Sequence, residues 1–191
     1  MNIFRLHFVL LEAVLSNFFT DVISNDPRFN SVSRVDDLGL LEPTTRELIQ
    51  RVVAGAKNLG IDVMVFETYR SQARQEELFR QGATQLQKVG VHHYGLACDI
   101  VKVVNGEPSW KGDFSFLGHL AHSAGLIWGG DWGNPDVTHT FIDEVHLQRC
   151  TVARQPDLFA GTWYPAKKYN PYQDEQYVMF AAVGTQKPSK T

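Results

Sequence analysis

The chain has 191 residues, of which 43% are hydrophobic and 20% are charged, and its formal net charge is -3. This size suits one globular domain with its own core, and the slightly acidic balance argues against nucleic acid or an anionic membrane surface as the main partner. The two cysteines, Cys98 and Cys150, are too few and too far apart for a disulfide framework or an all-thiolate zinc site. We expect two separate thiols, and a single bridge in an oxidising compartment is the alternative.

The first predicted element is an amphipathic helix near the N-terminus. Its apolar run is similar to a weak signal peptide, but Glu12 interrupts the run and no clean cleavage site follows. The run is also shorter than the roughly 20 apolar residues that span a bilayer. We therefore expect no transmembrane span and no clear signal peptide. Residues 1–34 are predicted to form a helical extension that packs on the domain or on a partner.

Residues 42–82 predict a helix, a buried strand and a second helix. Thr44 and Glu47 have the spacing of a capping box in front of a helical apolar repeat. The stretch IDVMVFET, rich in β-branched and aromatic residues, then predicts a buried strand. In the polar segment that follows, Ser71 is placed to cap a helix and Gly82 to end it.

The rest of the chain mixes strands and helices. A loop over residues 83–94 leads into the strand ACDIVKVV, which NGEPSW is expected to turn out of the sheet. DFSFLGHLAHSAGL predicts a helix, and a loop rich in Gly and Trp separates it from the strand-like THTFIDEVHLQ. Since no regular β-α-β repeat is present, the pattern favours an α+β fold around a small antiparallel sheet. We assign residues 35–170 to the main domain and residues 171–191 to a C-terminal tail.

Two kinds of chemistry compete for the segment VGVHHYGLACD. A nucleophilic Cys98 would need an exposed, electropositive setting and a nearby base, yet it lies inside an apolar strand and is expected to be structural. A metal site needs histidine and carboxylate ligands, and His92, Asp99 and the distant His146 supply them. The segment DEVHLQ also brings two carboxylates beside His146, one of which could act as a base. Spacing alone does not decide between His92 and His93.

The segment HHYGLACD resembles the SxHxxGxAxD signature of the bacterial cell-wall zinc peptidases. This family includes D-alanyl-D-alanine carboxypeptidases of the VanY type and L-alanyl-D-glutamate endopeptidases of phage endolysins. ETYRSQARQEELF, LIWGGDW and DEVH match three further family elements in the same order. Three positions depart from the family pattern: Gly90 stands where Ser is usual, His93 where Asn is frequent, and Leu147 where an aromatic residue is typical. These departures leave open to which subgroup of the family the sequence is most similar, and therefore which bond would be cut. The resemblance implies a hedgehog/D-Ala-D-Ala peptidase-like fold with a zinc site at the sheet, so that residues 35–170 would be the catalytic domain.

The resemblance also implies roles for individual residues. It implies that His92, Asp99 and His146 bind one Zn²⁺ and that Asp143 is the general base. In a regular strand Glu144, not Asp143, would share the face of His146, so Asp143 requires a turn just after it. Glu144 is therefore the alternative base.

Three residues are candidates for contact with the substrate. The resemblance places Arg70 over the substrate, where its guanidinium would steady the carbonyl oxygen of the bond that is cut. Gln75 matches a polar family position and is expected to hold the substrate or a loop, with an ordinary solvated residue as the alternative. Trp128 is expected either to wall the cleft or to pack in the core.

The leading hypothesis is zinc-dependent hydrolysis of peptidoglycan stem peptides. The aspartate at the base position and the WGGDW element favour an L-alanyl-D-glutamate endopeptidase. A D-alanyl-D-alanine carboxypeptidase and a non-catalytic zinc-binding module that recognises peptides are the alternatives. The expected partner is a peptidoglycan peptide, and the sequence does not indicate an oligomeric state. Action on the cell wall places the protein in the periplasm or outside the cell, and cytoplasmic accumulation before release, as for phage enzymes, fits the lack of a clear signal peptide.

Overall fold

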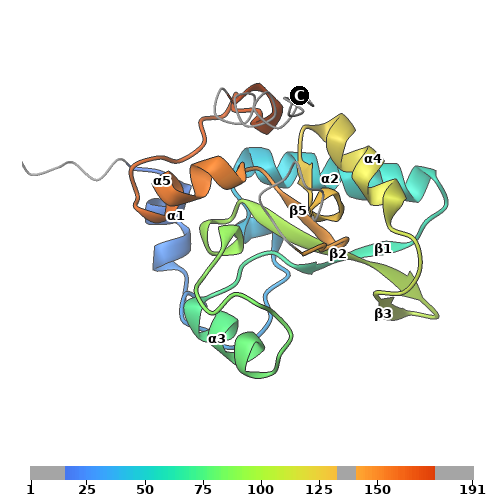
Figure 1. Cartoon of the computed structure of the whole chain (residues 1–191), viewed down its shortest axis with the longest axis horizontal. Helices are drawn as coiled ribbons and strands as arrows, with labels where there is room; N and C mark the ends of the chain where they lie inside the picture. Colours follow the sequence, from blue (N-terminus) through green and yellow to red (C-terminus); the bar gives the residue numbers. More distant parts are fainter. Residues whose placement is uncertain (1–15, 133–140, 175–191) are drawn as a thin grey trace, which may run out of the picture.

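The computed structural model describes residues 16–132 and 141–174 (Figure 1). Within these residues the strands are β1 (Val63–Glu67), β2 (Ala97–Val104), β3 (Glu107–Ser109), β4 (Ile127–Trp128) and β5 (His146–Gln148). The α-helices are α1 (Phe18–Asp21), α2 (Pro43–Asn58), α3 (Gln72–Arg80), α4 (Ser115–Ala124) and α5 (Gln155–Phe159). Short 3-10 helices are η1 (Ile23–Asn25), η2 (Leu38–Leu40), η3 (Val91–Tyr94), η4 (Gly129–Asp131), η5 (Val152–Arg154) and η6 (Pro171–Gln173).

The sheet is antiparallel throughout, in the order β1-β2-β5-β4, and β3 also pairs with β2. Helices α2 and α4 lie on one face, above the sheet in Figure 1. Cys98 and Ile100 of β2 point into the core that these helices cover. Since side chains alternate along a strand, Asp99 points to the opposite face. The register pairs Asp99 with Glu67 on β1 and with His146 on β5, so three polar residues form a row across the sheet.

The expected α+β fold with a small antiparallel sheet is confirmed. Strand β2 has the predicted bounds, and the side chain of Ser71 caps α3 by accepting a hydrogen bond from the Arg74 amide. The predicted capping box is wrong. The first long helix begins at Pro43, and the carboxylate of Glu42 caps it by accepting a hydrogen bond from the Thr45 amide.

Two strand predictions also need correction. NGEPSW does not leave the sheet, because Asn105 and Gly106 both have positive φ and turn the chain back into a hairpin with β3. The predicted strand THTFIDEVHLQ is short. Only His146–Gln148 pairs in the sheet, since the chain turns at residues 144–145. Residues 138–140 of that stretch lie outside the described residues.

Residues 16–34 contribute to a small hydrophobic cluster around Tyr69. Ile23 is fully buried with Tyr69, and Phe18, Phe19 and Phe29 pack around them. The Tyr69 hydroxyl donates a hydrogen bond of 2.7 Å to the Phe29 carbonyl. The division into residues 1–34, 35–170 and 171–191 stays a prediction, because residues 1–15 and 175–191 lie outside the described part of the chain. In the described part, no helix has the length and apolar character needed to cross a bilayer.

A buried ion pair ties the C-terminal part of the domain to α2. Arg149 is fully buried, and its Nη1 donates to Glu42 Oε2 at 2.8 Å. Its Nη2 donates to the carbonyls of three residues in the C-terminal segment: Ala166, Lys167 and Tyr169. One side chain thus fixes the start of α2 against a segment more than a hundred residues away in sequence.

Replacing Arg149 by methionine is expected to lower the free energy of unfolding by about 3–5 kcal/mol, because Glu42 would stay buried without its cation. Urea denaturation followed by circular dichroism measures the loss. Arg51→Met, which changes an exposed arginine on α2, the helix that Glu42 caps, is the control and should change stability by less than about 0.5 kcal/mol. A loss below about 1 kcal/mol in the Arg149 variant would contradict this account.

Candidate metal and active site

Three ligand atoms from separate elements meet on the open face of the sheet. His92 lies on η3, Asp99 on β2 and His146 begins β5, and all three are buried. The distances are 3.1 Å from His92 Nε2 to Asp99 Oδ1 and 3.1 Å from His92 Nε2 to His146 Nδ1. His146 Nδ1 lies 3.2 Å from Asp99 Oδ1. The three atoms therefore form a nearly equilateral triangle.

The turn between His92 and Asp99 explains why two residues seven positions apart converge. Gly95 ends η3 with a left-handed backbone, φ 68°. A Cβ at this position would lie 2.6 Å from the carbonyl oxygen of Leu40. Only glycine combines this backbone conformation with this close approach, so the glycine of the segment HHYGLACD is needed to bring η3 and β2 together.

The outer hydrogen bonds of the two histidines assign their tautomers. His92 Nδ1 donates to the Thr68 carbonyl at 3.1 Å. His146 Nε2 donates to Gln148 Oε1 at 3.0 Å, and the Gln148 amide is oriented by its own donation to the Cys150 carbonyl. Both rings therefore turn a lone pair toward the Asp99 carboxylate. Such second hydrogen bonds commonly orient metal-binding imidazoles.

The triangle fits a divalent cation. Two imidazole lone pairs and a carboxylate oxygen repel one another unless a positive charge lies between them. Burial lowers the pKa of His146, but the neighbouring Asp99, Asp143 and Gln148 side chains together outweigh burial and raise this pKa. Ligand atoms about 2.0–2.1 Å from a tetrahedral ion are separated by about 3.3 Å, close to the spacing found here. The three residues can thus hold a metal ion and leave room for a fourth ligand.

Arg70 connects this triangle to a buried glutamate. Its Nη2 donates to Asp99 Oδ2 at 2.8 Å, and its Nε donates to Glu67 Oε2 at 2.8 Å. The two oxygens of the Asp99 carboxylate therefore have different partners: Oδ1 faces the two histidines, and Oδ2 accepts from Arg70. Burial opposes the charge of Asp99, but His92, His146 and Arg70 outweigh it and hold the pKa of this carboxyl well below its ordinary value.

Asp143 lies at the turn that precedes His146. The His146 amide donates a hydrogen bond to the Asp143 carbonyl at 3.2 Å. The chain turns at residues 144–145, and this is the turn that a role of Asp143 as the base requires. Gly129 makes this possible, since a Cβ there would lie 2.3 Å from the Asp143 carbonyl oxygen. Burial, and then the charge of Asp99, raises the pKa of the Asp143 carboxyl. Glu144 is exposed, and among the described contacts its backbone carbonyl accepts a 2.7 Å hydrogen bond from Trp128 Nε1.

The other two substrate-binding candidates have structural contacts. Gln75 is buried, and its amide nitrogen donates to Thr84 Oγ1 and to the Leu86 carbonyl, so it holds the loop after α3. Its amide oxygen lies 3.5 Å from Arg70 Nη1. Trp128 is half-buried, and its ring lies so close to Gly118 that a Cβ there would be 2.4 Å away. Both side chains support the walls of the site.

The remaining candidates of the segment VGVHHYGLACD lie outside the triangle. His93 points into an aromatic cluster formed by four rings: Phe19, Phe29, Tyr69 and Tyr94. Burial lowers its pKa. Cys98 and Cys150 are free, buried thiols in two different core clusters, as expected. Burial raises the pKa of Cys98 well above its ordinary value, which opposes a nucleophilic role.

The sequence interpretation missed three groups that orient the site: Glu67, Gln148 and the Thr68 carbonyl. Gln148 had a readable signal, since it stands two residues after His146 and so on the same face of a strand. Glu67 also had one, as a charge at the end of an apolar strand and three residues before Arg70. Thr68 accepts the hydrogen bond from His92 through its backbone carbonyl, and a pattern of side chains in the sequence does not reveal a backbone contact.

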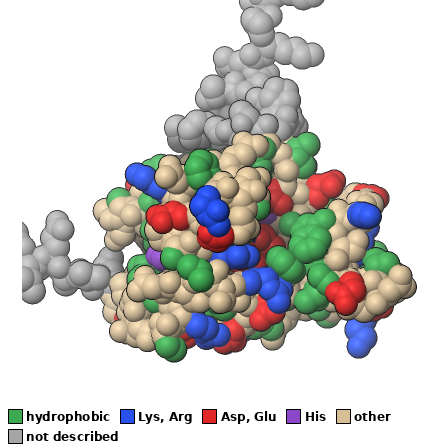
Figure 2. All heavy atoms as spheres, turned by 90° about the horizontal axis from the view of Figure 1, so that it is seen from below, with side chains coloured by type: hydrophobic (Ala, Val, Ile, Leu, Met, Phe, Trp, Pro, Cys, Tyr) green, Lys and Arg blue, Asp and Glu red, His purple; other side chains and the backbone are tan. Residues whose placement is uncertain are grey.

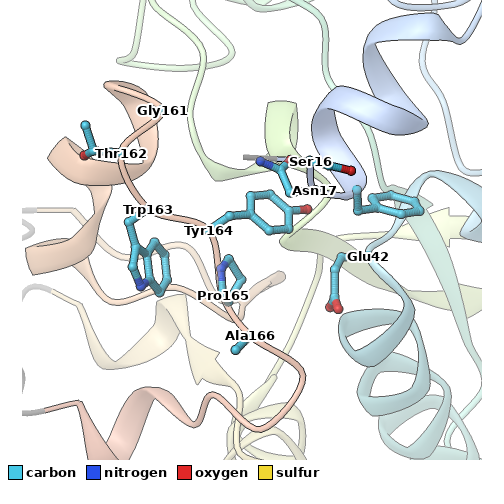
Figure 3. A pocket seen from close by; sticks show the side chains of 10 residues that line it. Ser16, Asn17, Glu42, Gly161, Thr162, Trp163, Tyr164, Pro165 and Ala166 are labelled. Carbon is cyan, nitrogen blue, oxygen red and sulfur yellow. The ribbon is translucent and has the colours of Figure 1, made fainter. Parts of the chain in front are cut away.

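A separate cavity of about 400 Å³ lies between α1 and the segment 161–166 (Figure 3). Glu42 lines it, but this carboxylate already binds Arg149 and Thr45. None of the three metal-ligand candidates lines this cavity. In the described part of the chain, the three metal-ligand candidates therefore lie away from this cavity, on the open face of the sheet.

The fold and the site define an α+β protein with a buried His-Asp-His cluster that could hold a metal ion, and the family described as D-alanyl-D-alanine carboxypeptidase matches residues 84–149. Peptidoglycan L-alanyl-D-glutamate endopeptidase CwlK of Bacillus subtilis is 31% identical over 127 residues, 56% of this chain and 72% of that protein. The chain belongs to this VanY-like peptidase family, as the segment HHYGLACD suggested.

Two further proteins are similar to this chain. The L-alanyl-D-glutamate peptidase of Listeria phage A118 is 30% identical over 112 residues, which cover 56% of this chain but 37% of that protein. The chain thus matches only part of this longer phage relative. Among solved structures, the L-Ala D-Glu endopeptidase ChiX of Serratia marcescens is 27% identical, with a TM-score of 0.40 over 63% of this chain and 93% of that chain.

Proposed function

We propose that the protein is a zinc peptidase that cuts the stem peptides of peptidoglycan, with the L-alanyl-D-glutamate bond as the favoured target. The observation that carries this proposal is the convergence of two imidazole lone pairs and one carboxylate oxygen at 3.1–3.2 Å. His92, Asp99 and His146 would hold the ion. The names of the Bacillus and phage relatives support the choice of bond.

Zinc held by these three residues would supply Lewis acidity, which would polarise a carbonyl and make water a better nucleophile near neutral pH. Asp143 accepts a proton from the attacking water as the water oxygen bonds to the alanyl carbonyl carbon. The same carboxyl then returns the proton to the leaving nitrogen as the carbon–nitrogen bond breaks. A raised pKa suits a group that must both take up and release a proton.

Arg70 is suited to the carbonyl oxygen of the scissile bond. Its Nη2 and Nε are held by Asp99 and Glu67, which fixes the plane of the guanidinium. Its Nη1 has one long contact, 3.5 Å to Gln75, among the described residues. A hydrogen bond from Nη1 can therefore strengthen as negative charge develops on the carbonyl oxygen.

Arg70→Ala is expected to lower turnover at least about a hundredfold, because a preorganised donor to the oxyanion is lost. Bound zinc should remain near one equivalent, and metal analysis of the same sample measures it. Arg80→Ala, which removes an exposed arginine on α3, is the control and should retain full turnover. Unchanged turnover in the Arg70 variant would refute the role of Arg70.

The site of action follows from the proposed substrate. Stem peptides lie in the cell wall, so the protein would work in the periplasm or outside the cell. The similarity to a phage peptidase supports accumulation in the cytoplasm followed by release to the cell wall, as for phage enzymes. A non-catalytic peptide-recognition module would not need Asp143 and Arg70 beside the ligands, and both are there.

Digestion of purified peptidoglycan, with and without a chelator, tests the proposed function. Mass spectrometry of the products should show new amino termini at D-glutamate, with L-alanine left on the sugar. Chelation should stop this release, and added zinc should restore it. Release of terminal D-alanine instead would identify a carboxypeptidase, whereas fragments that form equally with chelator present would rule out a metal-dependent reaction.

A further inference from the structure

The face that carries the metal-binding triangle differs in chemistry on its two sides. In Figure 1, helix α3 and the β2–β3 hairpin lie at opposite ends of the lower side of the sheet. Figure 2 looks onto this side, where Lys and Arg side chains gather next to a hydrophobic patch, with acidic side chains between them. A bound peptide therefore meets a cationic wall in one direction and an apolar wall in the other.

The cationic wall consists of Arg70 and Arg74, which share the buried carboxylate of Glu67. Arg70 binds Glu67 Oε2, and Arg74 Nε donates to Glu67 Oε1 at 3.2 Å. With the zinc ion of the proposed function bound, two guanidinium groups and the divalent cation would outweigh the charges of Glu67, Asp99 and Asp143. The net charge on this side would then be positive, which favours an anionic group of the substrate.

The apolar wall is a cleft of about 490 Å³ lined by Trp110, Phe114, Ile142, Asp143, Glu144 and Val145. Since Asp143 is one of its lining residues, the cleft reaches the proposed base. Trp110 is 50% exposed and Ile142 is 62% exposed, so both offer apolar surface to a ligand. The Trp110 ring is held edge-on by Phe66, with centroids 4.7 Å apart and planes at 82°. The indole ring of Trp110 is thus held in place by Phe66, exposed to solvent, and part of the cleft that includes Asp143.

If the L-alanyl-D-glutamate bond is the target, as the proposed function has it, the substrate also differs in chemistry on its two sides. These two sides match the cationic and the apolar wall. On the leaving side, a free carboxylate sits on the carbon attached to the scissile nitrogen. On the other side come the alanine methyl group, a lactyl group and an amino sugar, none of which is charged. About two chain units, or roughly 7 Å, separate the scissile carbonyl from the sugar. The sugar must therefore bind in a cleft that adjoins the base.

We propose that the cleft beside Asp143 binds the N-acetylmuramyl sugar of the substrate, with Trp110 as the stacking platform. The apolar C–H face of a pyranose packs well on an indole ring, which offers a large rigid surface. In this orientation the D-glutamyl carboxylate faces Arg70 and Arg74. The enzyme then prefers stem peptides that are still attached to glycan.

Two substrates separate this inference from the proposed function: a disaccharide tetrapeptide and the sugar-free tetrapeptide of the same sequence. Wild-type protein should cut both, with a kcat/KM at least about tenfold higher on the glycan-linked one. Trp110→Ala should lower kcat/KM about tenfold on the glycan-linked substrate and less than about twofold on the free peptide, the loss expected from one stacking contact. Trp110→Tyr keeps an aromatic face and should retain most of the preference.

The control is Phe159→Ala, which removes a similarly exposed ring on α5, outside the cleft, and should change neither rate. Thermal unfolding and zinc content establish that each variant is folded. Equal losses on both substrates, no loss on either, or a wild-type enzyme indifferent to the sugar would each overturn the sugar site while leaving the peptidase intact. Failure of the wild type to cut either substrate would instead overturn the proposed function, and the sugar site with it.

Discussion

His146→Ala is expected to lose both bound metal and hydrolysis. The substitution removes one of three protein ligands and leaves His92 and Asp99, which are too few for a catalytic zinc site of the usual kind. It also leaves Gln148 Oε1 without the imidazole donor that it accepts from. Zinc per protein chain, measured by elemental analysis after dialysis, should fall from about one to near zero, and peptide hydrolysis should become undetectable.

The matched control is His119→Ala. His119 is exposed on α4, and its ring bonds only to the Ser115 carbonyl of its own helix in the described contacts. This variant should keep one zinc and full activity. Since burial of His146 makes the first variant prone to unfolding, circular dichroism must accompany the metal analysis. A folded His146 variant that retains a full equivalent of zinc would remove His146 from the ligand set.

Asp143→Asn is expected to lower kcat by about 10²–10⁴-fold while zinc stays bound. The amide keeps the size of the side chain and the turn before His146, but it cannot accept a proton from water. The effect should therefore fall on kcat and much less on KM. Steady-state kinetics on the peptide substrate, with metal content measured in the same sample, tests this expectation.

Glu144→Gln is the control for Asp143 because the two carboxylates are adjacent in sequence but differ in setting. Glu144 is exposed, whereas Asp143 is close enough to Asp99, His146 and Arg70 to feel their charges. The Glu144 variant should stay within about threefold of wild type. If the Glu144 variant carried the large loss and the Asp143 variant did not, Glu144 would be the base.

Much of the local structure could be predicted from the sequence because its causes are local. Strand β2 was recognisable from its β-branched run, and Ser71 from its position before a polar helix. The Asn-Gly pair before β3 carried an equally local signal, because both residue types readily adopt positive φ. The turn was predicted there, but not the return of the chain into the sheet as β3. The N-cap of α2 was misassigned because Glu42 and Thr44 are both plausible caps in the sequence. Glu42 is held in the capping position by Arg149, which is 107 residues away and not visible to a local pattern.

The site itself was only partly predictable. The motif proposed His92 over His93, and the structure puts the former at the triangle and the latter in an aromatic cluster. The meeting of Asp99 with His146 depends on the register between β2 and β5, which joins segments 47 residues apart. The place of Glu67 depends on an irregularity in the pairing of β1 with β2 between Val65 and Glu67. Such long-range register is set by packing, and residue spacing does not encode it.

Zinc anomalous diffraction from crystals of the wild-type protein tests the central claim most directly. Data on either side of the zinc edge should give one strong peak about 2.0–2.1 Å from His92 Nε2, Asp99 Oδ1 and His146 Nδ1, with Asp143 facing the open coordination position. A peak bound by other residues, or no peak between these three atoms at saturating zinc, would contradict it.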